Sequence, residues 1–131
     1  MPKSDSFYEY GPVYNAYHRR AKEKGLAFHL SRREFAELIK GGCFYCGRGP
    51  DKEQARIKAN GRETLKCSGL DRVDNTLGYE PGNCVPCCTR CNRMKTNMTL
   101  EDFFQQVSRI YHFRMLEKDA DRILRQLGQT P

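Results

Sequence analysis

The chain has 131 residues, of which 38% are hydrophobic, with no tryptophan and seven cysteines. This length fits one domain with a small core, and such a core is often reinforced by a metal or by disulfides. The formal charge of +7 is typical of nucleic-acid binders, although many basic proteins bind no nucleic acid. The polar opening MPKSDSFYEY and the lack of a long apolar run predict neither a secretory signal nor a membrane span. We therefore expect a reducing, cytoplasmic setting in which paired cysteines bind metal.

Two helices are expected before the first cysteine. Pro12 opens the first helix, because proline is tolerated in a first helical turn, and Gly25 ends it. Ser31 and Glu34 form the S-x-x-E pattern of a capping box, which starts the second helix. Residues 1–40 are thus predicted to form a basic helical arm.

The middle of the chain predicts strand, loop, strand and helix in that order. Residues 43–67 hold a cysteine turn and a polar stretch, which we expect to form a loop or a loose hairpin. Residues 68–73 are strand-like, and residues 74–82 are rich in turn-forming asparagine, glycine and proline. A second strand is expected at 83–87, followed by a short helix at 89–97.

Two further helices are predicted in the C-terminal segment, residues 100–131. Thr99 can cap the first of them, with Asp102 three places further on. Its apolar positions follow helical spacing; they are Phe103, Phe104, Val107, Ile110 and Tyr111. The last helix is expected over about 115–127, before Gly128. The nearly balanced charge of this segment favours a packing or pairing surface.

Two C-x2-C elements, Cys43 to Cys46 and Cys88 to Cys91, stand far apart in the sequence. Zinc prefers four thiolates in a tetrahedron, and each C-x2-C lets one tight turn supply two of them. We expect these four cysteines to hold one structural Zn²⁺. Four protein ligands leave no open position for a water molecule, so this metal has no catalytic role.

A third C-x2-C element, Cys84 to Cys87, competes for the same zinc. Its second intervening residue, Pro86, has no N–H to donate to a thiolate, and this segment is better used as a strand. We therefore assign Cys84, Cys87 and Cys67 as small buried hydrophobic residues.

Four motifs follow one another in a specific order: CxxCG from Cys43, LDRxD from Leu70, GYxxxN from Gly78 and CxxCNxxK from Cys88. Their order resembles the HNH nucleases, whose site is a ββα-metal unit, also called a His-Me finger. The resemblance covers about residues 41–99. It implies an α+β fold: a small ββα-metal core stapled by a four-cysteine zinc, with flanking α-helices, within a single domain of residues 1–131.

The resemblance also implies roles for individual residues. Asp71 matches the family's metal-binding aspartate, and Asn92 matches the second protein ligand of a catalytic Mg²⁺ or Mn²⁺. Asn83 matches the middle residue of the motif, which pins the loop by hydrogen bonds to the backbone. Arg72 stands where the family's general-base histidine would be; an arginine stays protonated, but it can hold a phosphate. Tyr45 is our candidate base, if a nearby guanidinium lowers its pKa, although a tyrosine that merely packs on the zinc turn is an equal alternative.

Basic side chains on two predicted helices are candidates for contacts with nucleic acid. They are Arg90, Arg93 and Lys95 near the second knuckle, and Arg19, Arg20 and Lys22 on the N-terminal arm. The resemblance implies an endonuclease that cuts double-stranded DNA to 5′-phosphate and 3′-hydroxyl ends, in a bacterial cell or a phage-infected host. Symmetric cutting would require a homodimer. The alternatives are a non-catalytic, zinc-stapled DNA- or RNA-binding module and a zinc domain for protein interaction.

Overall fold

Two compact units make up the computed structural model, Met1–Asn97 and Met98–Pro131. The structure describes residues 10–58, 61–115 and 119–128. The division falls close to the predicted boundary between the core and the C-terminal helices. That the two units act as one domain stays a prediction. Among the described residues, no helix is long and apolar enough to cross a membrane.

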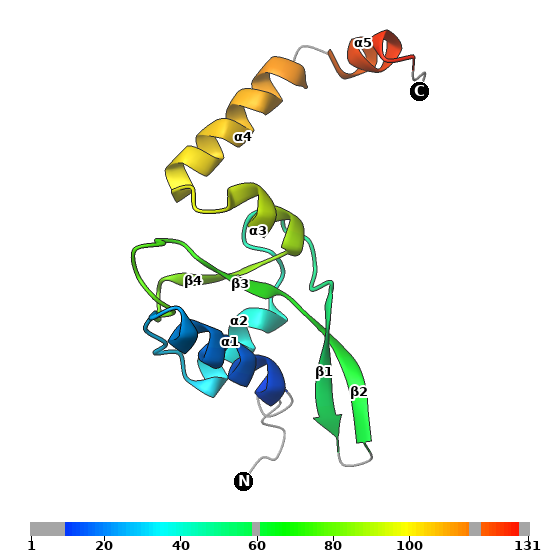
Figure 1. Cartoon of the computed structure of the whole chain (residues 1–131). Helices are drawn as coiled ribbons and strands as arrows, with labels where there is room; N and C mark the ends of the chain where they lie inside the picture. Colours follow the sequence, from blue (N-terminus) through cyan, green and yellow to red (C-terminus); the bar gives the residue numbers. More distant parts are fainter. Residues whose placement is uncertain (1–9, 59–60, 116–118, 129–131) are drawn as a thin grey trace. The chain divides into compact units, whose positions relative to one another are not determined.

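Helices α1 (Gly11–Glu23) and α2 (Arg32–Lys40) form the N-terminal part of the first unit (Figure 1). The predicted capping box is confirmed: the Ser31 hydroxyl accepts from the Glu34 N–H at 3.0 Å, and the Glu34 carboxylate accepts from the Ser31 N–H at 2.9 Å. These reciprocal bonds satisfy two backbone donors that a helix start otherwise leaves unpaired, and they fix where α2 begins.

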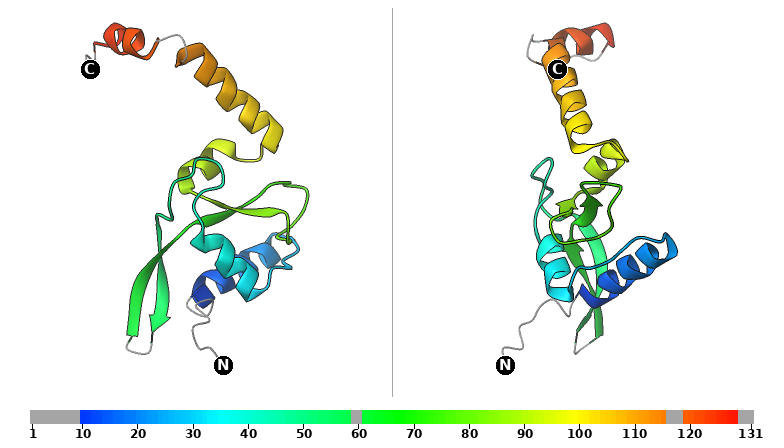
Figure 2. Two further views of the ribbon diagram at one scale, coloured as in Figure 1. Left: turned by 180° about the vertical axis from the view of Figure 1, so that it is seen from behind. Right: turned by 90° about the vertical axis from the view of Figure 1, so that its left-hand side faces the viewer.

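Residues 43–67, predicted as a loop or a loose hairpin, contain a regular hairpin. Strands β1 (Lys52–Lys58) and β2 (Gly61–Cys67) pair antiparallel and form a two-stranded sheet of their own. Figures 1 and 2 show this ribbon extending away from the other strands.

The predicted strand, loop, strand and helix are confirmed. Strands β3 (Gly69–Arg72) and β4 (Cys84–Cys87) pair antiparallel, and α3 (Thr89–Lys95) follows directly. The helix α3 ends two residues earlier than expected, because Thr96 adopts a positive φ of 49°. Together these elements form the ββα core (Figure 2).

Aromatic rings from four segments pack between the N-terminal helices and this core. Tyr14 and Tyr17 of α1 each meet Phe35 of α2 edge to face, with centroids 5.5 and 5.4 Å apart. Phe28 and Tyr79 complete the group, at 5.5 Å from one another. Because α2 also packs against β3 and β4, the N-terminal helices cover and support the ββα core.

The loop between β3 and β4 is fastened to the segment that joins α1 and α2. The Tyr79 N–H donates to the Ala27 carbonyl, and the His29 N–H donates to the Tyr79 carbonyl, both at 2.8 Å. Gly78 lies directly against Ala27: a Cβ on this glycine would come 2.7 Å from the Ala27 nitrogen and closer still to its carbonyl oxygen. Only glycine allows this approach of the two backbones.

The second unit contains helices α4 (Leu100–Arg114) and α5 (Asp119–Gln126). Thr99 caps α4 as predicted, accepting from the Asp102 N–H at 3.0 Å. The last helix, expected over about 115–127, is present as α5, and Met115 belongs to the end of α4 as its C-cap. Leu116, counted in that prediction, lies outside the described residues.

We predict that Gly78→Ala destabilises the first unit. The added methyl group must push the two backbones apart, which typically costs about 1–3 kcal/mol, so the melting temperature should fall by several degrees. Gly49→Ala is the control, because a Cβ there meets no atom within 4 Å. Thermal unfolding followed by circular dichroism measures both; equal melting temperatures for the two variants would contradict the close approach.

Candidate functional site

Four cysteines converge on one point, and they are the four that the sequence selected. Cys43 and Cys46 come from a tight turn that Gly47 closes with a φ of 77°. Cys88 is the N-cap of α3, where its sulfur accepts from the Cys91 N–H at 3.4 Å. The four sulfur atoms all lie within 4.8 Å of one another, as tetrahedral coordination of one metal ion requires.

The electrostatics of this cluster favour a bound cation. Burial alone would raise the pKa of the Cys43 thiol, but hydrogen bonds from the backbone N–H groups of Cys88, Cys46 and Tyr45 outweigh it and lower that pKa to about 6. Burial, followed by hydrogen bonds with the neighbouring thiols, raises the pKa of Cys91. One thiol is thus prepared as a thiolate, while further thiolates beside it need a positive ion to offset their repulsion.

The other three cysteines are buried outside the cluster, as expected. Cys67 and Cys84 belong to the hydrophobic core between the N-terminal helices and the strands, and Cys87 lies beside the metal-ligand group without joining it. Burial raises the pKa of the Cys84 thiol to about 11, so it stays neutral near pH 7. The strand β4 occupies the segment between Cys84 and Cys87, which confirms the reason for preferring Cys88 and Cys91.

Asp71 is the centre of the candidate site. It lies on β3 with 4% of its surface exposed. Its Oδ2 accepts a hydrogen bond of 2.5 Å from the Tyr45 hydroxyl, and the Lys95 Nζ lies 3.1 Å from the same oxygen. The cysteine cluster brings together the turn that carries Tyr45 and the helix that carries Lys95, and these two segments supply both donors to Asp71.

Lys95 lies elsewhere than the predicted phosphate-binding patch. Its side chain has 0% exposure, and besides Asp71 its Nζ donates to the Arg72 carbonyl at 3.5 Å. A fully buried ammonium group has no surface to offer to a phosphate, so direct DNA contact by Lys95 does not fit this structure. The signal was present in the sequence: Lys95 stands four places after Cys91, one turn further along the inward face of α3.

The pKa of the Tyr45 phenol is shifted in the opposite direction from the one that the sequence predicts. Burial, then the hydrogen bond to Asp71 and the charge of Asp71, raise the pKa of Tyr45 far above its usual range. This direction is opposite to the lowering that a nearby guanidinium predicts.

The Arg72 guanidinium turns to the loop between β3 and β4. Its Nη1 donates to the carbonyls of Asn75 at 3.0 Å and Leu77 at 2.8 Å, and the group lies over the Tyr79 ring, 5.6 Å from its centroid.

Asn83 fastens the same loop by hydrogen bonds to the backbone. Its Nδ2 donates to the carbonyls of Asp74 at 3.1 Å and Gly78 at 2.9 Å, while its Oδ1 accepts from the Asp74 N–H at 2.9 Å. The Asp74 carboxylate accepts from the side chain and the backbone of Thr76 and so closes the turn. This geometry is the one expected for a loop-pinning asparagine.

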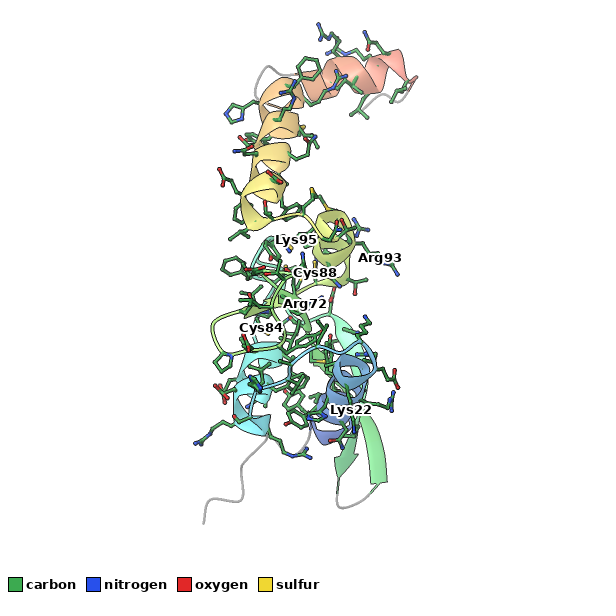
Figure 3. All side chains as sticks on the ribbon, turned by 60° about the vertical axis from the view of Figure 1, so that its left-hand side comes forward. Lys22, Arg72, Cys84, Cys88, Arg93 and Lys95 are labelled. Carbon is green, nitrogen blue, oxygen red and sulfur yellow. The ribbon has the colours of Figure 1, made fainter. Side chains whose placement is uncertain are left out.

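The exposed surface of α3 carries Asn92, Arg90 and Arg93. Asn92 stands three residues before the buried Lys95 and is itself exposed, and its predicted role beside Asp71 stays a prediction. Figure 3 shows Arg93 pointing away from the ribbon, whereas Lys95 turns inward toward the strand that carries Arg72.

The basic residues on α1 are exposed but partly engaged. Arg19 lies 3.8 Å from Glu23, and the Arg20 guanidinium lies 4.7 Å from the centroid of the Tyr17 ring. Lys22 is exposed on the same helix and stands apart from α3 in Figure 3. These side chains therefore form a group separate from Arg90 and Arg93.

No family model matches the chain. One relative, an uncharacterised protein of Acanthamoeba polyphaga mimivirus, is 42% identical over 89 residues, which are 68% of this chain and 14% of that protein. A solved structure of the rare-cutting HNH restriction endonuclease PacI superposes with a TM-score of 0.55 at 24% identity, covering 87% of this chain and 92% of that one. This likeness, together with the cysteine cluster, shows that the chain has an HNH-like fold: α+β, with a ββα core.

We predict that the purified protein carries about one equivalent of metal per chain in the four-cysteine cluster. Cys88→Ser should lose that metal and much of its thermal stability, because the cluster supplies a large part of the folding free energy of a small core. Cys84→Ala, which changes a buried cysteine outside the cluster, is the matched control and should keep the metal. Elemental analysis of the wild-type protein and the two variants measures the metal content of each. A Cys88→Ser variant that retains its metal would contradict the ligand assignment.

Proposed function

We propose that this chain is a divalent-metal-dependent DNA endonuclease of the HNH type, which hydrolyses phosphodiester bonds to leave 5′-phosphate and 3′-hydroxyl ends. The observation that carries the proposal is the placement of Asp71. It is a nearly buried carboxylate on the first strand of an HNH-like ββα core, next to the helix that presents Asn92.

Two kinds of metal belong to the proposal. In the cysteine cluster we propose one structural Zn²⁺, because four thiolate donors suit zinc and exclude ions that prefer oxygen. For the second metal we propose Mg²⁺ or Mn²⁺, held by the Asp71 carboxylate and the Asn92 amide oxygen. These are the oxygen donors that Mg²⁺ prefers, and it retains water as its other ligands. When bound, such an ion polarises the scissile phosphate and stabilises the charge on the leaving oxygen.

The residues around Asp71 prepare the site. The bonds from Tyr45 and Lys95 fix the carboxylate through Oδ2. Arg72 and Asn83 hold the neighbouring loop through its carbonyl groups. Because Arg72 has five N–H donors, those not used by the loop can donate to a phosphate oxygen.

Tyr45 is proposed to orient the attacking water. Its raised pKa opposes formation of a phenolate, so Tyr45 is not proposed to act as an ionised general base. A phenol oxygen whose proton is directed to Asp71 still has lone pairs that can accept a hydrogen bond from water. This water would then lie beside the acid that is proposed to hold the metal.

Double-stranded DNA is the proposed partner. Arg90 and Arg93 are exposed on α3, on the helix that carries Asn92, and they are proposed to contact phosphates next to the scissile bond. Arg19, Arg20 and Lys22 on α1 would contact phosphates further away. The chain spans about 14% of its mimivirus relative, so the activity of any whole protein of that kind is likewise a proposal.

A second candidate function is a zinc-stapled module that binds DNA or RNA without cleaving it. One observation favours it: the Lys95 ammonium already pairs with the carboxylate that the proposed metal needs. In that case Asp71 and Lys95 would form a structural ion pair of the core.

Asp71→Asn should abolish cleavage of supercoiled plasmid in Mg²⁺ or Mn²⁺, with a loss of more than a thousandfold. This substitution keeps the shape of the side chain and its hydrogen bonds but removes the charge that holds the cation. Gel analysis of nicked and linear products, with EDTA as a control, measures it. Cleavage that persists in Asp71→Asn would reject this site. A wild-type protein that binds DNA but cleaves it with neither Mg²⁺ nor Mn²⁺ would favour the module that binds without cleaving.

Tyr45→Phe should lower the rate of cleavage at least a hundredfold and leave DNA affinity unchanged, in the range typical of groups that act on the nucleophile. Tyr14→Phe is the matched control, because it removes a phenol whose hydroxyl donates to the Leu30 carbonyl, away from the site. Single-turnover rates and fluorescence anisotropy give the two quantities. Near-normal rates for Tyr45→Phe would leave this tyrosine with only a packing role on the cysteine turn.

A further inference from the structure

The two carboxylate oxygens of Asp71 have different surroundings. Its Oδ2 accepts from the Tyr45 hydroxyl at 2.5 Å and lies 3.1 Å from the Lys95 Nζ. Among the described residues, no contact engages Oδ1. In this part of the chain no buried side-chain oxygen or nitrogen lacks a hydrogen-bond partner, so Oδ1 must reach the surface. The small exposed part of Asp71 therefore includes the oxygen that is left for a cation.

The Lys95 ammonium is fixed beside this carboxylate. Its side chain is fully buried, and its Nζ also donates to the Arg72 carbonyl at 3.5 Å. Cys91, one turn earlier on α3, is buried as well and belongs to the four-cysteine cluster. Figure 3 shows Lys95 turned inward toward the strand that carries Arg72. The ammonium therefore cannot move into solvent, when a second cation reaches Asp71, without breaking both of its contacts.

A fixed positive charge weakens a neighbouring carboxylate as a ligand for another cation. The ionised side chains of Asp71 and Lys95 together carry no net charge. A divalent cation at Oδ1 is attracted by the carboxylate and repelled by the ammonium on its other oxygen. Both effects are strong at a buried site, because charges interact more strongly where water is excluded. The pair is therefore a weaker cation site than the carboxylate would be alone.

We propose that Lys95 is a positioning residue that acts as a fixed counter-cation to Asp71. It holds Oδ2, leaves Oδ1 to the divalent metal, and keeps the affinity of the DNA-free protein for that metal low. This inference rests on the proposed metal site at Asp71. A DNA phosphate at the site supplies the negative charge and the oxygen ligand that the neutral pair lacks, so the metal binds together with the substrate.

A purely structural ion pair and a counter-cation lead to different expectations for the loss of Lys95. Either role makes its removal destabilising, because Asp71 is left as a nearly buried charge without a partner. Only the counter-cation role also makes the site bind a divalent cation more tightly. The affinity for the cation, measured without DNA, therefore separates the two roles.

Binding of Mn²⁺ to the purified full chain tests the proposal, with free Mn²⁺ measured by electron paramagnetic resonance. Lys95→Gln keeps a hydrogen-bond donor beside Asp71 but removes the charge, and it should lower the dissociation constant for Mn²⁺ by about tenfold or more. Lys95→Met removes the donor as well and should change this constant in the same direction. Lys24→Gln removes an equal charge from the exposed end of α1 and is the matched control, with an unchanged constant.

A second substitution assigns the added affinity to Asp71. Asp71→Asn in the Lys95→Gln background should abolish the tighter Mn²⁺ binding. Thermal unfolding gives an independent measurement. Without Mn²⁺ the Lys95→Gln variant should melt below the wild type, and added Mn²⁺ should raise its melting temperature more than that of the wild type, because a ligand that binds the folded state stabilises it.

Three outcomes would overturn the proposal. They are a Lys95→Gln variant that binds Mn²⁺ no more tightly than the wild type, a Lys24→Gln variant with the same gain, and Lys95 variants that stay unfolded at millimolar Mn²⁺. Cleavage by the wild type that depends on Asp71, with unchanged Mn²⁺ affinity in Lys95→Gln, would reject only this inference. Tighter binding in the variant, with no cleavage by the wild type, would reject only the nuclease activity.

Discussion

The convergence of four cysteines is the constraint on which the rest of the first unit depends. Cys43 and Cys46 come from a turn before the β1–β2 hairpin, and Cys88 and Cys91 begin α3. The buried group around them consists of cysteines with Tyr45 packed against it, and the four sulfur atoms lie as close together as one metal ion would require. The cysteine cluster thus sets the distance from Tyr45 to the end of α3.

The candidate site depends on this distance between Tyr45 and Lys95. Tyr45 and Lys95 reach the same oxygen of Asp71 from the two segments that the cluster joins. A second support comes from the opposite side, where the segment between α1 and α2 holds the β3–β4 loop through Tyr79. Asp71 and its loop are therefore held between the cysteine cluster and the N-terminal helices.

The helices of the second unit are determined by local capping rather than by a cluster of cysteines. Its helices are amphipathic, and their capping is well defined, with Thr99 bonded to the first turn of α4. Capping and propensity decide that a helix forms, but they do not supply a partner for its apolar side.

Local chemistry in the sequence determined the elements and the four cysteines that cluster. The capping box at Ser31, the strands on either side of a turn-rich loop and the two C-x2-C pairs each depend on neighbours a few residues away, which a sequence displays directly. Tertiary structure alone decided which side chains meet across long separations. It buried Lys95 against Asp71 instead of exposing it to a phosphate, turned Arg72 to the carbonyls of its own loop, and raised the pKa of Tyr45 where a nearby arginine had suggested the opposite. The physical reason is that burial and pairing depend on the three-dimensional neighbours of a charge, and spacing along the chain does not specify those neighbours.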